Sequence, residues 1–70
     1  MIPAEKIAAL AELYDGFAHA LDPFSSERDR AEDAFYLMLE NLRCDYAPRA
    51  EIRDFNREAV RQCKLFLKKN

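Results

Sequence analysis

The sequence predicts an all-α protein: a compact, antiparallel, up-down-up bundle of three helices, with a homodimer as one candidate assembly. Half of the 70 residues are hydrophobic, which is enough for a core. Residues that favour helices dominate, whereas Thr is absent and Val occurs once, so strands have little support. One Gly and three Pro provide few turns, so the elements must be long. We expect residues 1–70 to form a single domain.

The first helix is expected over residues 3–21. Its apolar side chains recur at three- and four-residue steps, the spacing of one helix face. This stripe comprises Ile7, Leu10, Tyr14, Phe17 and Leu21. The segment LDPFSSE, residues 21–27, ends the helix, because Asp-Pro followed by two Ser is typical of turns and caps. Either Ser26 with Asp29 imitates a capping box, or Asp22 caps a helix that begins at Pro23.

The second helix is expected over residues 25–44 and the third over residues 48–68. Pro48 ends the second helix, since it biases Ala47 away from helical geometry, and Pro48 itself can begin the third. Each helix carries one apolar face. The inner face of the second is Ala31, Ala34, Phe35, Met38, Leu39 and Leu42, and that of the third is Ile52, Phe55, Ala59, Cys63 and Phe66.

The third helix carries an uneven share of the charge. Residues 1–47 hold four Lys and Arg against ten Asp and Glu, whereas residues 48–70 hold seven against three. On a wheel of about 100° per residue the cations share one arc, which we call the basic flank. It comprises Arg49, Arg53, Arg57, Arg61, Lys64 and Lys68. Either the flank lies over acidic residues of the first two helices, or it is a docking face for an acidic protein or for phosphates.

Two further surfaces are candidates for contacts. The small residues Ala9, Gly16 and Ala20 form a ribbon with Leu13 beside the main stripe of the first helix. Either the first helix uses this ribbon to contact both other helices, or the ribbon is a homodimer contact. Tyr36 and Leu37 lie off the main face of the second helix, and an exposed Tyr is a common anchor of interfaces.

The sequence does not favour an enzyme, a cofactor or a metal site. His19 and the two Cys lack the spacing of metal ligands, and the single Gly excludes a Gly-rich phosphate loop. A bundle of this length is also expected to lack a pocket of several hundred Å³. The chain has neither a signal-peptide pattern nor an apolar run long enough for a membrane span, so we expect a cytoplasmic protein that does not bind a membrane.

These observations predict a non-enzymatic protein–protein interaction module, a small adaptor or regulator that acts by docking a helix face. Its expected partner is another protein, with an acidic surface as the best match for the basic flank, or a second copy of the chain. The alternative is a nucleic-acid-associated helper that uses the basic flank. Nucleic acid is the less favoured partner, because DNA-binding domains tend to be strongly basic and this chain carries a net charge of -2.

Overall fold

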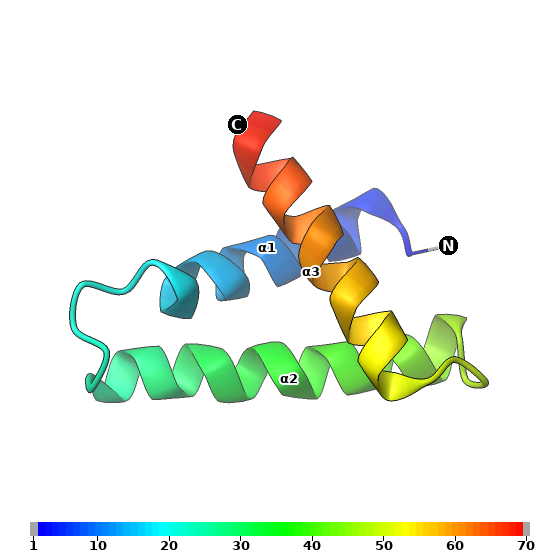
Figure 1. Cartoon of the computed structure of the whole chain (residues 1–70), viewed down its shortest axis with the longest axis horizontal. Helices are drawn as coiled ribbons and strands as arrows, with labels where there is room; N and C mark the ends of the chain where they lie inside the picture. Colours follow the sequence, from blue (N-terminus) through cyan, green and yellow to red (C-terminus); the bar gives the residue numbers. More distant parts are fainter. Residues whose placement is uncertain (1, 70) are drawn as a thin grey trace.

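The computed structural model describes residues 2–69 and confirms an all-α, three-helix bundle. The helices are α1 (Ala4–Ala18), α2 (Ser26–Tyr46) and α3 (Ile52–Lys69). Figure 1 shows α1 and α2 running antiparallel, with α3 returning obliquely across α1. Helix α1 packs along both of the others, whereas α2 and α3 contact each other at few positions. The helices α2 and α3 therefore share α1 as their common support.

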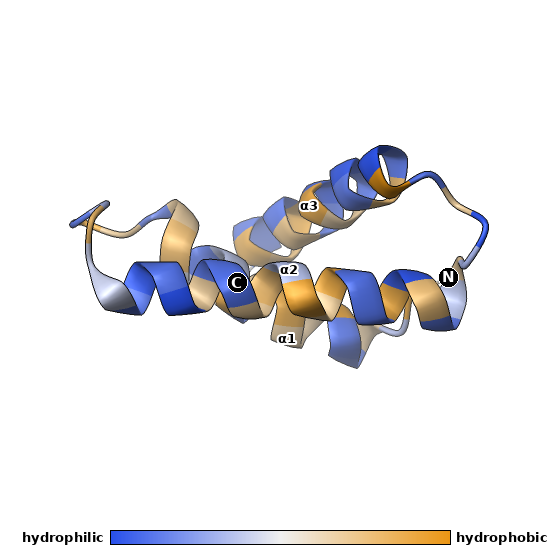
Figure 2. Cartoon of the chain, turned by 90° about the horizontal axis from the view of Figure 1, so that it is seen from below, coloured by the Kyte–Doolittle hydropathy of each residue, from blue (hydrophilic) through white to orange (hydrophobic). Residues whose placement is uncertain are grey.

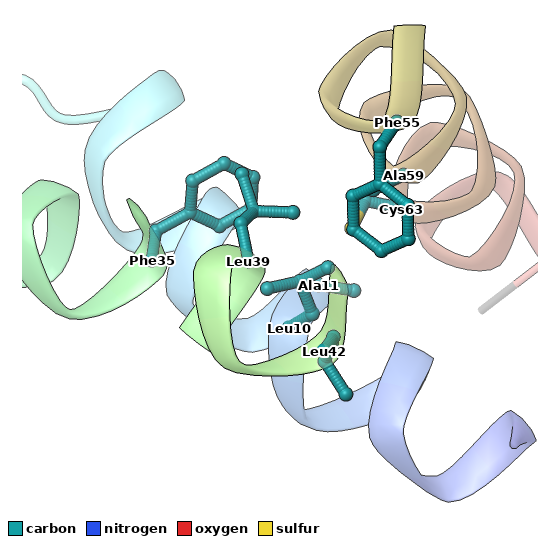
Figure 3. Packing of buried hydrophobic residues seen from close by; sticks show 8 residues of the cluster. All are labelled: Leu10, Ala11, Phe35, Leu39, Leu42, Phe55, Ala59 and Cys63. Atoms are coloured by element: carbon teal, nitrogen blue, oxygen red, sulfur yellow. The ribbon is translucent and has the colours of Figure 1, made fainter. Parts of the chain in front are cut away.

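The core gathers side chains from all three helices, as Figure 3 shows. Phe35 of α2 is fully buried, and its ring lies 5.1 Å from that of Phe17 and 5.7 Å from that of Tyr14 on α1. Such edge-to-face and tilted pairs stabilise beyond the area they bury. The fully or nearly fully buried residues are Ile7, Leu10, Ala11, Phe35, Leu39, Leu42, Phe55, Ala59 and Cys63. The predicted inner faces thus supply the core.

The first helix is shorter than expected, because α1 ends at Ala18 rather than at residue 21. Leu21, which we expected in the apolar stripe, is fully exposed, and Phe24 in the same connection is 91% exposed. The residue before Pro23 is disfavoured in helical geometry, so the chain leaves the helix before it reaches Asp22. Asp22 then forms an Asx turn, its Oδ1 accepting from the backbone N–H of Phe24 at 3.0 Å.

Both residues predicted as alternative N-caps of the second helix are wrong, Ser26 by one residue and Asp22 by three. The N-cap of α2 is Ser25, whose Oγ accepts from the backbone N–H of Arg28 at 3.1 Å. This contact satisfies one of the orphan N–H groups at the helix start. Ser26 is instead the first residue of α2, and Asp22 lies in the preceding turn.

The third helix begins at Ile52, four residues later than expected, and α2 continues to Tyr46. Pro48 and Arg49 form a turn in which Ala50 N–H donates to the carbonyl of Ala47 at 2.9 Å. Pro48 therefore sits in the connection, where its carbonyl accepts from Arg43 Nη1 at 3.4 Å. Ile52, expected in the core, is 54% exposed because it opens α3 at the edge of the bundle.

Candidate functional site

A groove lies between α2 and α3, which diverge as Figure 2 shows. Its volume is about 1040 Å³, and a single side chain of α2, Tyr36, lines it opposite α3. Four members of the basic flank line the α3 side, and we call these four the cationic wall. The cationic wall comprises Arg53, Arg57, Arg61 and Lys64. Ile52 and Val60 provide apolar surface between these cations, and the sharing of α1 by both helices leaves room for the groove.

The remaining two members of the predicted basic flank lie elsewhere. Arg49 stands in the turn before α3, so it cannot continue the helical arc, and Lys68 lies near the end of α3 beyond the groove lining. The flank predicted from the wheel therefore contracts to the four residues of the cationic wall. The late start of α3 is the reason for the loss of Arg49.

Among residues 2–69, two cations of the cationic wall form ion pairs, and both pairs lie within α3. Arg57 Nη1 lies 3.9 Å from Asp54 Oδ1, and Arg61 Nε donates to Glu58 Oε2 at 2.8 Å. Within residues 2–69, no ion pair joins a cation of α3 to a carboxylate of α1 or α2. The interpretation that the flank lies over acidic residues of the first two helices is therefore wrong, since α2 and α3 diverge where those pairs would form.

Glu58 marks the edge of the cationic wall. Hydrogen bonds from Arg61 and Gln62 lower the pKa of its carboxyl to about 2. Both groups are exposed, so the pair contributes little to stability. Arg61 donates to Glu58 through Nε and Nη2, so its Nη1 remains available to a second acceptor.

Tyr36 is half exposed, as expected for an interface anchor, yet its ring is supported from below. The ring centroid lies 5.4 Å from that of Phe35 and 6.5 Å from that of Phe17. Because the aromatic cluster of the core packs against one side of the ring, Tyr36 presents its other side to solvent. Leu37 is 65% exposed and lies outside the groove lining.

The small-residue ribbon of the first helix is used mainly inside the chain. A Cβ built on Gly16 would lie 3.3 Å from the Cβ of Ala31 on α2. Leu13 packs against the core, and Ala9 is exposed. The expectation that Ala20 continues the ribbon is wrong, since α1 ends at Ala18. The contacts of α1 with both other helices support the first of the two interpretations of this ribbon.

A second groove, which sequence reasoning missed, lies between the start of α1 and the outer part of α3. Its volume is about 700 Å³, and its apolar lining includes Ile2, Ile7, Phe55 and Leu65. The expectation that the bundle has no room for a pocket of this size is wrong. Oblique crossing of α3 opens space at both sides of that helix, and helical periodicity carries no information on crossing angles.

The polar groups outside the grooves form few clusters. Cys44 is exposed and Cys63 is buried, and burial raises the pKa of the Cys63 thiol to about 11. His19 Nδ1 lies 2.8 Å from Asp15 Oδ1 on the surface of α1. In the part of the chain that the structure describes, no group of three or more His, Cys, Asp or Glu is placed to hold a metal ion. No helix among residues 2–69 is both long and apolar enough to cross a membrane.

Comparison of the chain with protein-family models, with curated proteins and with solved structures found no match.

Proposed function

We propose that the protein is a non-enzymatic protein–protein interaction module, a small adaptor or regulator that docks an acidic partner in the groove between α2 and α3. One observation carries the proposal. The cationic wall and the half-exposed Tyr36 line the same groove, and no carboxylate of α1 or α2 is ion-paired with the wall within residues 2–69. Arg57 and Arg61 pair with exposed acids of their own helix, so an external partner can still approach the wall.

The groove combines the two contributions that a docking site needs. Tyr36, Ile52 and Val60 supply apolar surface, which gives affinity when a partner covers it. The cations attract an acidic partner over a distance and fix its orientation, although each exposed pair contributes at most about 1 kcal/mol. Such a site favours an acidic segment with one or two apolar anchors.

We expect the groove to bind a partner and not to catalyse a reaction. Arginine and lysine side chains, an asparagine and a tyrosine surround it, with Glu51 as the acidic member. General acid–base catalysis needs a partnered acid or base of suitable pKa within reach of a substrate.

We also propose that the protein is cytoplasmic, because its two free thiols, one exposed and one buried, suit a reducing compartment.

A titration with synthetic peptides tests this function. The ¹⁵N-labelled protein is titrated with an amphipathic helical peptide that carries Glu and Leu, and amide shifts are recorded by NMR. We expect the largest shifts at Tyr36 and along the inner side of α3, and weaker binding at high salt. A matched peptide with every Glu replaced by Lys is the control. Equal binding of both peptides, or shifts confined to α1, would contradict the proposal.

The cationic wall also supports the alternative, a nucleic-acid-associated helper, since phosphates favour arginine. This function predicts that binding of a DNA duplex or a single-stranded RNA falls steeply between about 50 and 200 mM salt. The overall charge of -2 opposes it. Tight nucleic-acid binding together with no peptide binding would replace the first function by this alternative.

A further inference from the structure

We propose that the occupant of the groove is a second copy of this chain. In the resulting symmetric dimer, the acidic stripe of each α2, defined as Asp29, Asp33 and Glu40, lies against the cationic wall of the other copy. The inference rests on the proposed function, because it names the partner of the same groove. The placement, the length and the exposure of the two surfaces support it.

The acidic stripe and the groove are neighbours on the same helix. At about 100° per residue, Asp29, Asp33 and Glu40 fall within about 40° of one another on α2. Tyr36 lies about 20° beyond Asp29 on this wheel, and it is the α2 residue that lines the groove. Each molecule therefore presents a cationic surface and an anionic surface side by side, with Tyr36 at the border between them.

The two surfaces also match in length. The acidic stripe spans eleven residue steps from Asp29 to Glu40, and the cationic wall spans eleven from Arg53 to Lys64. At about 1.5 Å per residue each surface is about 16 Å long. A helix that carries this stripe can therefore place a carboxylate near each end of the wall.

The carboxylates of the stripe protrude further than the arginines that pair with them. Asp29 is 65% exposed and its partner Arg28 is 26% exposed, while Glu40 is 49% exposed and its partner Arg43 is 15% exposed. Asp33 is exposed and forms no ion pair within residues 2–69. The stripe thus presents negative charge to the surroundings even though two of its three acids have local partners.

A twofold axis near Tyr36 would satisfy both surfaces at once. In such an isologous contact, the stripe of one copy meets the wall of the other and the reverse contact follows by symmetry. Tyr36, which is half exposed, would then lie near the centre, where interfaces place their anchors, and the exposed Leu37 would lie at the far edge of the acidic stripe. A standard interface would cover about 800 Å² of each copy, a modest part of its 5266 Å² surface. The added burial would also stabilise a chain of only 70 residues.

Sedimentation equilibrium from low-micromolar to millimolar concentration tests the dimer directly. We expect a monomer–dimer equilibrium that shifts toward the monomer as salt is raised, because charge pairs at an exposed rim are screened. A wild-type protein that stays monomeric at millimolar concentration and low salt would overturn the inference. A dimer that is unchanged by salt would also overturn it, since the contact would not depend on charge.

Complementary charge reversals test which surfaces meet. The wall variant R53E/K64E and the stripe variant D29K/D33K should each weaken self-association at least about tenfold, because like charges then face each other. Mixed together, the two variants should form a heterodimer, since each reversed surface meets the opposite charge. The double variant E5K/E12K, which reverses two exposed acids on α1, is the matched control and should dimerise as the wild type does.

Circular dichroism of each variant establishes that it is folded, and Leu37→Ser offers a second variant that changes no charge. Leu37→Ser should weaken the dimer as well. Failure of the two charge variants to associate when mixed, while both are folded, would overturn the inference. A monomeric wild type that still binds the acidic peptide would overturn the second copy as partner but leave the proposed function standing. A monomeric wild type that binds no peptide would end both.

Discussion

Gly16 of α1 lies against Ala31 of α2, so closely that a methyl group in place of its hydrogen would make a tight contact. A Cβ added to Gly16 would lie 3.3 Å from the Cβ of Ala31, closer than most such contacts in proteins. The two helices approach each other here just before α1 ends at Ala18. The only glycine of the chain therefore lies at a close approach of α1 and α2, beside the aromatic cluster.

Substitution of Gly16 tests this close approach. Gly16→Ala should raise the free energy of unfolding by about 0.5 kcal/mol, because Ala favours the helix by about 1 kcal/mol and the last turn of α1 can shift slightly. Gly16→Leu should lower it by about 1–3 kcal/mol, since the larger side chain forces the helices apart. Urea denaturation measures both. Equal stability of the Leu variant and the wild type would show that the contact is loose.

Two phenylalanines in and next to α2 should respond to substitution to very different extents. Phe35→Ala should lose about 3–5 kcal/mol, because Phe35 is fully buried in the core and its removal leaves a cavity. Phe24→Ala is the control and should change stability by less than about 0.5 kcal/mol, as its side chain is 91% exposed. Thermal melting followed by circular dichroism compares them. If Phe35→Ala unfolds the chain, the milder Phe35→Leu should still melt below the wild type.

The capping role of Ser25 can be separated from that of its neighbour. Ser25→Ala should destabilise the protein by about 1 kcal/mol, because the backbone N–H of Arg28 loses its acceptor. Ser25→Asp should retain most of the stability, since a carboxylate accepts the same hydrogen bond and suits the helix dipole. Ser26→Ala lies one residue into α2 and should be close to neutral. A larger loss for Ser26→Ala than for Ser25→Ala would place the cap one residue later.

The two thiols should differ in their rate of modification. Cys44 is exposed, so a disulfide reagent should label it quickly in the native protein at mildly alkaline pH. Cys63 is buried with a raised pKa, so its labelling should follow unfolding of the bundle. A Cys44→Ser variant isolates the slow site, and added urea should accelerate it. Fast labelling of Cys63 without urea would mean that α3 separates readily from α1.

The raised pKa of the Cys63 thiol leads us to expect a loss of stability at alkaline pH. Its pKa is about 11 in the folded protein against 9.0 for the reference thiol. The contribution of the protonated Cys63 thiol to the free energy of unfolding is therefore fully present below pH 9. It is lost as the pH rises through the pKa of the folded state, because the unfolded thiol releases its proton first. Cys63→Ala should show a flatter decline in this window, measured as the difference between the urea midpoints of variant and wild type.

The amino-acid sequence by itself determined which residues form helices and which faces they bury. Side chains such as Phe35, Leu39 and Cys63 recur at helical spacing, and a helix face that is apolar must be covered whichever partner covers it. The exposure of Tyr36 and Leu37 and the arc of cations on the third helix followed from the same local periodicity.

Only the tertiary structure decided what these faces meet. The end of α1 and the start of α3 depend on where the chain must turn. For this reason Leu21 and Ile52 lie outside the core, and Arg49 lies outside the helical arc of cations. The oblique path of α3 across α1 depends on how side chains far apart in the chain interlock, which no local pattern encodes. That path brought Tyr36 of α2 opposite four cations of α3, and it created the groove on which the proposed function rests.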